Sequence, residues 1–170
     1  MIITTSDNVK LNVKKTGKGK VVLFVHEFGG DQRSWKPQVS YFSRRYECIT
    51  FNARGYPPSD VPKSIESYSQ ERAVEDIYDV MNELSIDKAH IVGLSMGGFA
   101  ALHFGIKYPK KTISLTIAGS GYGAEKKHEN YFRKISRDVA NQFIQLGSKE
   151  FSKIYGRASS RIPFLIKDKD

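Results

Sequence analysis

The pentapeptide Gly93-Leu-Ser95-Met-Gly97 has the residue types and the spacing of a nucleophile turn. It lies between an expected strand over residues 89–94 and an expected helix over residues 97–108. A sharp strand-to-helix turn strains its apical residue and brings the residues two before and two after it so close that only small side chains fit. Glycine stands at both of those positions. The spacing therefore predicts that Ser95 lies at the apex, where its hydroxyl can attack a carbonyl carbon.

Two phosphate-binding motifs compete for the same glycine-rich segment. A P-loop needs a lysine after its last glycine, where Phe99 stands, and the dinucleotide fingerprint needs G-x-G-x-x-G, which this spacing fails to give. An isolated G-x-S-x-G also arises by chance. The strand before the motif, the helix after it and a second loop at the same sheet edge favour the nucleophile turn.

The same turn supplies one donor for an oxyanion hole. Because Met96 opens a helix, its backbone N–H points to where a substrate oxygen would lie, and the helix dipole favours negative charge there. The second donor is expected from the loop over residues 26–30 (HEFGG), with the Phe28 N–H as the candidate. His26 and Gly29 are expected to shape this loop, as Gly93 and Gly97 shape the turn.

Strands and helices alternate between residue 20 and residue 118. The continuous apolar run over residues 21–25 is typical of a parallel strand that is covered on both faces. Further strands are expected over residues 46–51 and 113–117. Such alternation predicts an α/β fold with a mostly parallel sheet and flanking helices, in which ligands gather at the carboxyl ends of the strands.

Local signals refine this outline. Alternating apolar residues over 9–13, followed by a turn over residues 16–19, predict an N-terminal β-hairpin. Ser34 and Ser69 are each expected to cap a helix, because a serine hydroxyl accepts a hydrogen bond from an N–H of the first helical turn. The stretch from residue 124 onward is polar, with the spacing of an amphipathic helix.

Three ordered segments together resemble the α/β-hydrolase superfamily. Residues 22–30 (VLFVHEFGG) look like its oxyanion loop, residues 52–60 (NARGYPPSD) like the loop after the next strand, and residues 90–102 (HIVGLSMGGFAAL) like its nucleophile elbow. The likeness runs through nearly the whole chain. It implies an α/β-hydrolase fold that lacks its last strands, with residues 1–123 as the truncated core and residues 124–170 as the start of a helical cap.

A serine nucleophile speaks against the haloalkane dehalogenase and epoxide hydrolase branches of that superfamily. It favours the esterase, lipase, C–C hydrolase and haloperoxidase-like branches. The resemblance therefore implies a serine hydrolase that acts on an ester-like or other carbonyl small molecule by acyl transfer to Ser95. The alternative is a catalytically inactive binding module with the same fold, or a truncated fragment.

Two departures from the family pattern stand out. Glu27 follows His26 where the family more often has glycine, and a carboxylate there opposes negative charge on a substrate oxygen unless it is paired or points away. The family's acid and histidine follow the elbow on loops after two further strands, which this sequence lacks. None of its four histidines is expected to act as the base, so the 170-residue chain alone is expected to be inactive or very weak.

The net charge of +9 raises a third class, a basic nucleic-acid binder. Residues 124–170 hold 11 Lys and Arg against 6 Asp and Glu, so over half of the excess lies in the last quarter. The basic residues are interleaved with Glu and Asp, and no zinc-ligand spacing or RNA-recognition signature accompanies them. A solvated face is the expected interpretation, without a nucleic-acid partner.

The remaining expectations concern compartment, cofactors and partners. The longest purely apolar run, residues 21–25, is far shorter than the roughly 20 residues that span a bilayer, and the N-terminus has no basic signal-peptide region. A single cysteine, Cys48, agrees with a reducing cytoplasm. No cofactor, metal or membrane partner is expected. The strand over residues 113–117 is an open edge and a candidate surface for self-association.

Overall fold

The computed structural model describes residues 1–121, 125–157 and 166. The chain divides into two compact units, Met1–Ser120 and Gly121–Asp170. The boundary that the sequence placed between residues 123 and 124 lies outside the described residues. Within those residues, no helix combines the length and the apolar character needed to cross a membrane.

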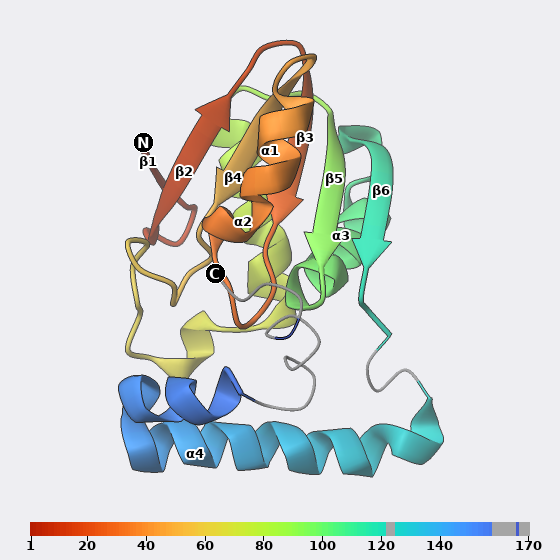
Figure 1. The fold of residues 1–170 in the computed structure, drawn as a ribbon. Coiled ribbons are helices and arrows are strands. Elements are labelled where there is room, and N and C mark those ends of the chain that lie inside the picture. Colours follow the sequence, from red (N-terminus) through yellow and green to blue (C-terminus); the bar gives the residue numbers. More distant parts are fainter. Residues whose placement is uncertain (122–124, 158–165, 167–170) are drawn as a thin grey trace. The chain divides into compact units, whose positions relative to one another are not determined.

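Six strands of the first unit form one sheet in the order β1-β2-β4-β3-β5-β6 (Figure 1). Neighbours among β3, β4, β5 and β6 run parallel, whereas β1 and β2 pair antiparallel, as do β2 and β4. The mostly parallel sheet predicted from the alternation of elements is thus confirmed. The strands are β1 (Ile2–Thr4), β2 (Lys10–Thr16), β3 (Lys20–Val25), β4 (Tyr46–Phe51), β5 (Ala89–Leu94) and β6 (Thr112–Ala118).

The N-terminal antiparallel pair is present, but its turn differs from the expected one. Strand β1 pairs with β2, with Ile3 opposite Leu11, so the turn of the hairpin lies between residues 4 and 10. The expected turn over residues 16–19 instead leads from β2 to β3, and β4 lies between these two strands. A three-residue strand shows too little alternation to be recognised in the sequence.

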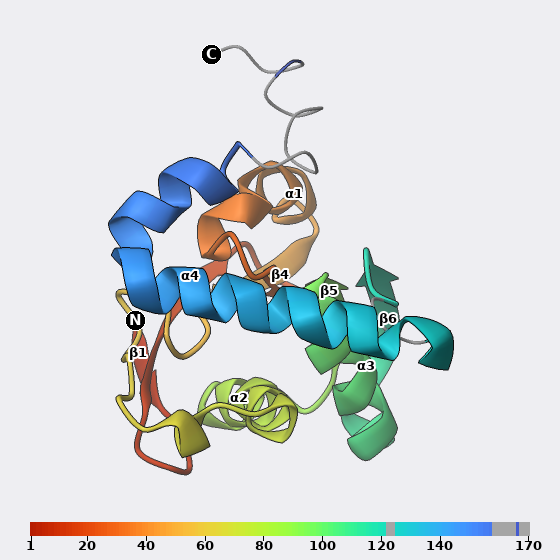
Figure 2. The same cartoon turned by 90° about the horizontal axis from the view of Figure 1, so that it is seen from below.

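Helices cover both faces of the sheet. Helix α1 (Lys36–Phe42) lies on one face, and α2 (Gln70–Glu83) and α3 (Met96–Lys107) lie on the other (Figure 2). Short 3-10 turns precede or join these elements, at Gln32–Trp35, Ile65–Ser67 and Pro109–Lys111.

One of the two expected serine caps is confirmed. The Ser69 side chain accepts a hydrogen bond from the Arg72 N–H at 2.9 Å and begins α2. The cap expected from Ser34 is wrong, because Asp31 accepts from the Arg33 N–H at 2.7 Å one turn earlier. The Ser34 hydroxyl is directed elsewhere, to Glu27.

The larger of two buried apolar clusters lies on the α2 and α3 side of the sheet. Its fully buried members come from four strands and both helices, and include Leu11, Leu23, Ile49, Ile77, Ile91 and Phe104. A smaller cluster of Val22, Phe24, Trp35 and Cys48 lies on the α1 side. Burying one such side chain stabilises the fold by about 1.5–3 kcal/mol, so this double-sided core holds the strand ends in place.

Strand β6 forms one edge of the described sheet. Its three alternate apolar residues, Ile113, Leu115 and Ile117, are 45%, 36% and 36% exposed. Self-association through this edge stays a prediction.

The second unit carries helix α4 (Glu129–Tyr155), which follows a 3-10 turn at Lys126–His128. The helix is kinked at Gly147, whose φ is 71°. Phe151 is its buried residue.

Candidate active site

Ser95 lies at the junction of β5 and α3 with a strained backbone. Its φ is 52° and its ψ is −115°, a region that non-glycine residues rarely occupy. Such a conformation costs about 1–3 kcal/mol and persists only where the surroundings impose it. The Ser95 N–H donates to the Ala118 carbonyl at 2.8 Å, and the Ser95 carbonyl accepts from Ser120 Oγ at 3.0 Å. The N–H and the carbonyl of Ser95 are thus tied to the last residue of β6 and to the segment that follows it.

The glycines around Ser95 are required by close backbone packing. A Cβ at Gly93 would overlap the Gly97 carbonyl oxygen and lie 2.8 Å from the Gly98 Cα. A Cβ at Gly97 would overlap the Val25 carbonyl oxygen and lie 2.7 Å from the His26 carbonyl oxygen. The first clash is within the turn, and the second is between α3 and the end of β3. These glycines therefore press the turn against the neighbouring loop as well as against itself.

The loop over residues 26–30 leaves the sheet beside this turn. In the parallel pairing of β3 with β5, Val25 lies opposite Gly93, so both chains leave the sheet at its carboxyl edge. Met96 is the first residue of α3, where the backbone N–H has no acceptor within the helix. Phe28 lies in a turn of the loop with its side chain 41% exposed, and Gly29 beside it is exposed.

Tyr56 connects the two segments. Its hydroxyl donates to the Phe28 carbonyl at 2.9 Å and lies 3.8 Å from Met96 Sδ. Its ring meets the His26 ring edge-on, with centroids 4.7 Å apart. One phenol therefore contacts both residues whose N–H groups are the candidate oxyanion donors. Sequence reasoning missed Tyr56, although it stands inside the segment 52–60 that carries the family resemblance.

His26 is buried completely and uses both ring nitrogens on the backbone. The Ala53 N–H donates to Nε2 at 3.0 Å, so Nδ1 carries the proton and donates to the Glu27 carbonyl at 2.8 Å. Burial lowers the pKa of His26 below its ordinary value of 6.5. This neutral ring joins the loop after β3 to the loop after β4, which leaves it no role as a base.

Glu27 is paired within its own loop. Its Oε1 accepts from Ser34 Oγ at 2.9 Å, and a Cβ at Gly30 would overlap that same oxygen. The second oxygen, Oε2, is buried and has no hydrogen-bond partner among the described residues. The carboxylate that the sequence places beside the oxyanion loop thus has the hydroxyl of Ser34 as a hydrogen-bond partner.

The loop after β4 is held by its own polar side chains. Asn52 Nδ2 donates to the Pro57 carbonyl at 2.7 Å, and Asn52 Oδ1 accepts from the Gln32 N–H at 3.0 Å. Ser59 Oγ donates to the Asn52 carbonyl at 2.7 Å. The loop that carries Tyr56 is thus folded back on β4 and linked to the segment before α1.

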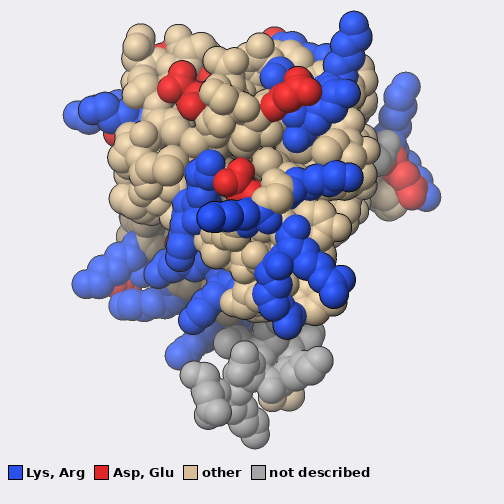
Figure 3. Space-filling model, turned by 90° about the horizontal axis from the view of Figure 1, so that it is seen from above, with Lys and Arg blue, Asp and Glu red and all other residues tan. Residues whose placement is uncertain are grey.

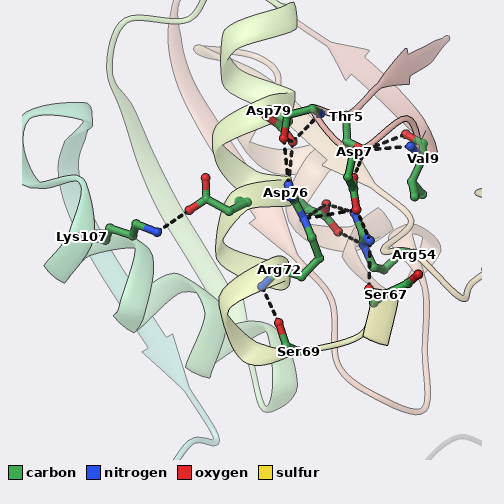
Figure 4. Close-up of polar contacts among 12 residues, drawn as sticks. Thr5, Asp7, Val9, Arg54, Ser67, Ser69, Arg72, Asp76, Asp79 and Lys107 are labelled. Carbon is green, nitrogen blue, oxygen red and sulfur yellow. Dashed lines mark hydrogen bonds and ion pairs between the residues drawn. The ribbon is translucent and has the colours of Figure 1, made fainter. Parts of the chain in front are cut away.

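Arg54 ties the same loop to α2 through a buried ion pair with Asp76, and to the turn between β1 and β2 through a partly buried ion pair with Asp7 (Figure 4). Its guanidinium donates to both carboxylate oxygens of Asp76, at 2.7 and 2.8 Å, and to both of Asp7, at 2.8 and 2.9 Å. The Arg54 and Asp76 side chains are 5% and 2% exposed. The hydrogen bonds from Arg54 lower the pKa of Asp7. Sequence reasoning missed this network, because Arg54 is separated along the chain from Asp76 by 22 residues and from Asp7 by 47.

The hydroxyl of Ser95 has no hydrogen-bond partner among the described residues, which include all four histidines. His90 Nδ1 lies 2.8 Å from Ser114 Oγ, on β6 rather than at the elbow. His103 is exposed on α3, and His128 Nε2 lies 4.0 Å from Glu125. The described residues also contain no group of three His, Cys, Asp or Glu side chains arranged to hold a metal ion.

The alpha/beta hydrolase fold model matches residues 20–160 of this chain. The chain belongs to the α/β-hydrolase family. The match covers the elbow, the loop after β3 and the loop after β4, which confirms the resemblance and the fold class drawn from these segments.

Individual relatives agree with this assignment. The chain is 34% identical over 122 residues to 3-oxoadipate enol-lactonase 1 of Acinetobacter baylyi, covering 71% of this chain and 45% of that protein. It is 36% identical over 109 residues to epoxide hydrolase 1 of Caenorhabditis elegans, covering 63% and 27%. A solved epoxide hydrolase from hot-environment metagenomes superposes with a TM-score of 0.66 at 26% identity, covering 68% and 40%. The chain therefore spans less than half the length of these α/β-hydrolases.

Proposed function

We propose that this chain carries the nucleophile and the oxyanion hole of a serine hydrolase acting on an ester-like or other carbonyl small molecule. The observation that carries the proposal is the strained backbone at Ser95. Glycine would adopt this conformation at no steric cost. A serine held there places a hydroxyl at the carboxyl edge of the sheet, where ligands of α/β folds bind.

In the proposed reaction, Ser95 Oγ attacks the acyl carbonyl carbon while its proton passes to a base. None of the chain's four histidines is hydrogen-bonded to Ser95, so in the 170-residue chain that base is a water molecule. The N–H groups of Phe28 and Met96 stabilise the resulting oxyanion. The carbonyl re-forms as the leaving group departs with that proton, and water then releases the acyl group by the same steps. Tyr56 is proposed to hold the two donor residues at a fixed separation.

The relatives support a hydrolase, and their names suggest two alternative substrate classes, carbonyl compounds and epoxides. The enol-lactonase is named for a substrate with an acyl carbonyl, and the epoxide hydrolases for a strained ether. Serine at the apex favours the carbonyl class, because attack by a hydroxyl on an acyl carbon gives an ester that water can cleave.

The 170-residue chain alone is proposed to react slowly. All four histidines lie in described parts of the chain, and none hydrogen-bonds to Ser95. An oxyanion hole and binding can still supply about 10³–10⁴-fold over water without the other triad members. The same observation favours the second candidate, a catalytically inactive binding module.

The single buried thiol of Cys48 fits a reducing compartment, and a cytoplasmic location is included in the proposal.

Acetylation by p-nitrophenyl acetate separates the two candidates. The serine hydrolase predicts release of p-nitrophenol with one acetyl group added to the intact protein mass, and loss of both in Ser95→Ala. Ser114→Ala is the matched control, because Ser114 is a serine that does hydrogen-bond a histidine. Absence of acetylation in the folded wild-type chain would favour the binding module.

A further inference from the structure

Basic side chains gather at the edge of the sheet opposite Ser95. This amino edge is where β3, β4, β5 and β6 begin and where the antiparallel β2 ends. Each of these strands contributes Lys or Arg there, from its own end or from the segment just before it. We call the set the basic edge: Lys14, Lys15, Lys18, Lys20, Arg44, Arg45, Lys88, Lys110 and Lys111.

The sequence and the fold together create this concentration of charge. Residues 14–20 hold four of the nine cations, and the parallel topology brings the other five, which are scattered up to residue 111, to the same edge. Figure 3 shows the molecule from this side. Lys and Arg are distributed across the face, and few Asp or Glu lie between them. Three acidic residues belong to the same edge, Glu47, Glu83 and Asp87.

Most of these cations have no partner among the residues that the structure describes. Lys15 forms an ion pair with Glu47 at 3.1 Å. Arg44 Cζ lies 4.8 Å from the centre of the Tyr41 ring, and Lys111 Nζ lies 5.3 Å from the centre of the Tyr78 ring. The other six are exposed and have no ion pair or hydrogen bond from their side chains to any described residue: Lys14, Lys18, Lys20, Arg45, Lys88 and Lys110.

We propose that the basic edge docks the protein onto the surface of an anionic lipid membrane. Clustered like charges repel one another, so this arrangement opposes folding slightly and is favourable only toward a negative partner. Each Lys or Arg near an anionic bilayer contributes attraction that adds to that of its neighbours. Six unpaired cations on one side of the molecule meet that requirement.

Three observations favour a lipid surface over a nucleic acid. The cations are spread over a broad area rather than along a line, which suits a sheet of headgroups. Seven of the nine cations are Lys, whose ammonium group acts as a point charge. Nucleic-acid sites favour Arg, whose planar guanidinium can bind two phosphate oxygens at once. Tyr41 and Phe42, just before Arg44, are 64% and 38% exposed, and aromatic rings favour the level of the headgroups.

The docked orientation would leave the candidate active site free. Strand β5 joins the two edges through its six residues from Ala89 to Leu94, a length of about 20 Å. A membrane at the amino edge is therefore separated by the length of this strand from the edge that carries Ser95. This inference does not depend on the proposed hydrolase activity.

Vesicle co-sedimentation of the full 170-residue chain tests the proposal. Phosphatidylcholine vesicles are compared with phosphatidylcholine–phosphatidylserine vesicles, in low salt and in high salt. We expect binding to the anionic vesicles alone, weakened by salt because the attraction is screened. Equal binding to both vesicle types, or no binding to the anionic ones in low salt, would overturn the proposal.

Two triple variants with the same change of net charge locate the surface. Lys18→Gln/Lys20→Gln/Lys88→Gln removes three unpaired cations of the basic edge and should weaken binding by about 100-fold. The control, Lys10→Gln/Lys36→Gln/Lys63→Gln, removes three exposed cations near the opposite edge and should change binding far less. Circular dichroism checks that both variants fold.

Two further outcomes would also overturn the proposal. Equal losses in the two triple variants would mean that net charge alone, and not this edge, drives binding. Tighter, edge-dependent binding to a single-stranded oligonucleotide than to anionic vesicles would assign the surface to nucleic acid instead.

Discussion

The two candidate donors of the oxyanion hole are held by different kinds of force. Met96 is fixed by steric packing, because Gly93, Ser95 and Gly97 leave the elbow a single compact path. Phe28 is fixed by hydrogen bonds, through Tyr56 on its carbonyl and through the neighbouring His26 ring. The comparison shows that a rigid site can combine a segment with no room to move and a segment held by a polar network. The two should fail differently under mutation.

We expect the largest loss of stability when one charge is removed from the buried ion pair that holds the Tyr56 loop. Arg54→Met leaves Asp76 buried without its main partner, and breaking a buried ion pair from one side costs about 3–5 kcal/mol. We expect a loss of unfolding free energy in this range, measured by urea denaturation. The double variant Arg54→Met/Asp76→Leu should recover most of it, because it removes both charges. A single variant as stable as the wild type would show that the network does not hold the loop after β4.

In the closely packed elbow around Ser95, one added methyl group should lower the free energy of unfolding. Gly97→Ala places a Cβ against the Val25 carbonyl, where backbone atoms must shift, and overpacking of this kind costs about 1–3 kcal/mol. Gly105→Ala is the matched control in the same helix, since the three atoms nearest its new Cβ all belong to the movable Leu115 side chain. Urea denaturation should show a loss for the first variant and little change for the second. Equal stability of the two would contradict the steric account.

The His26 link should make stability depend on pH. Burial lowers the pKa of His26, so the folded chain keeps it neutral while the unfolded chain takes up a proton below pH 6.5. Unfolding free energy should therefore be independent of this group above pH 6.5 and should fall below it, by up to about 1.4 kcal/mol per pH unit. The measurement is denaturation between pH 5.5 and 7.5 for the wild type and His26→Gln. An unchanged slope in the variant would mean that His26 is not the group responsible.

The Tyr56 hydroxyl should have the smallest effect on stability. Tyr56→Phe removes one hydrogen bond to the Phe28 carbonyl and should cost about 1 kcal/mol. Acetylation of Ser95 should slow by more than that loss explains, because Phe28 is no longer held. Tyr68→Phe is the control, since its hydroxyl also donates to a backbone carbonyl, that of Pro62 at 2.8 Å. Equal acetylation rates in the two variants would remove Tyr56 from the site.

The same contrast explains what the sequence could predict. Steric features are local, so the G-x-S-x-G spacing located the elbow between a strand and a helix, and the structure has β5 and α3 there. Ser69 was found as a cap because its signal lies three residues from the N–H that it binds.

Features that join distant segments were missed. Arg54 meets Asp7 and Asp76 across 47 and 22 residues, and Tyr56 meets Phe28 across 28. No periodicity marks such pairs. The hairpin predicted at the Thr16–Gly19 turn is wrong for the same reason. Gly17 and Gly19 indicate that the chain turns there, but not which strand pairs with which.

Labelling with a fluorophosphonate probe tests the central claim most directly, since the probe forms a covalent bond with an activated serine. The account predicts slow attachment of one probe per chain, mapped to Ser95 by peptide mass spectrometry, retained in Ser114→Ala and lost in Ser95→Ala. Probe attached to Ser114 or to any other serine, or a folded chain that stays unlabelled, would contradict it.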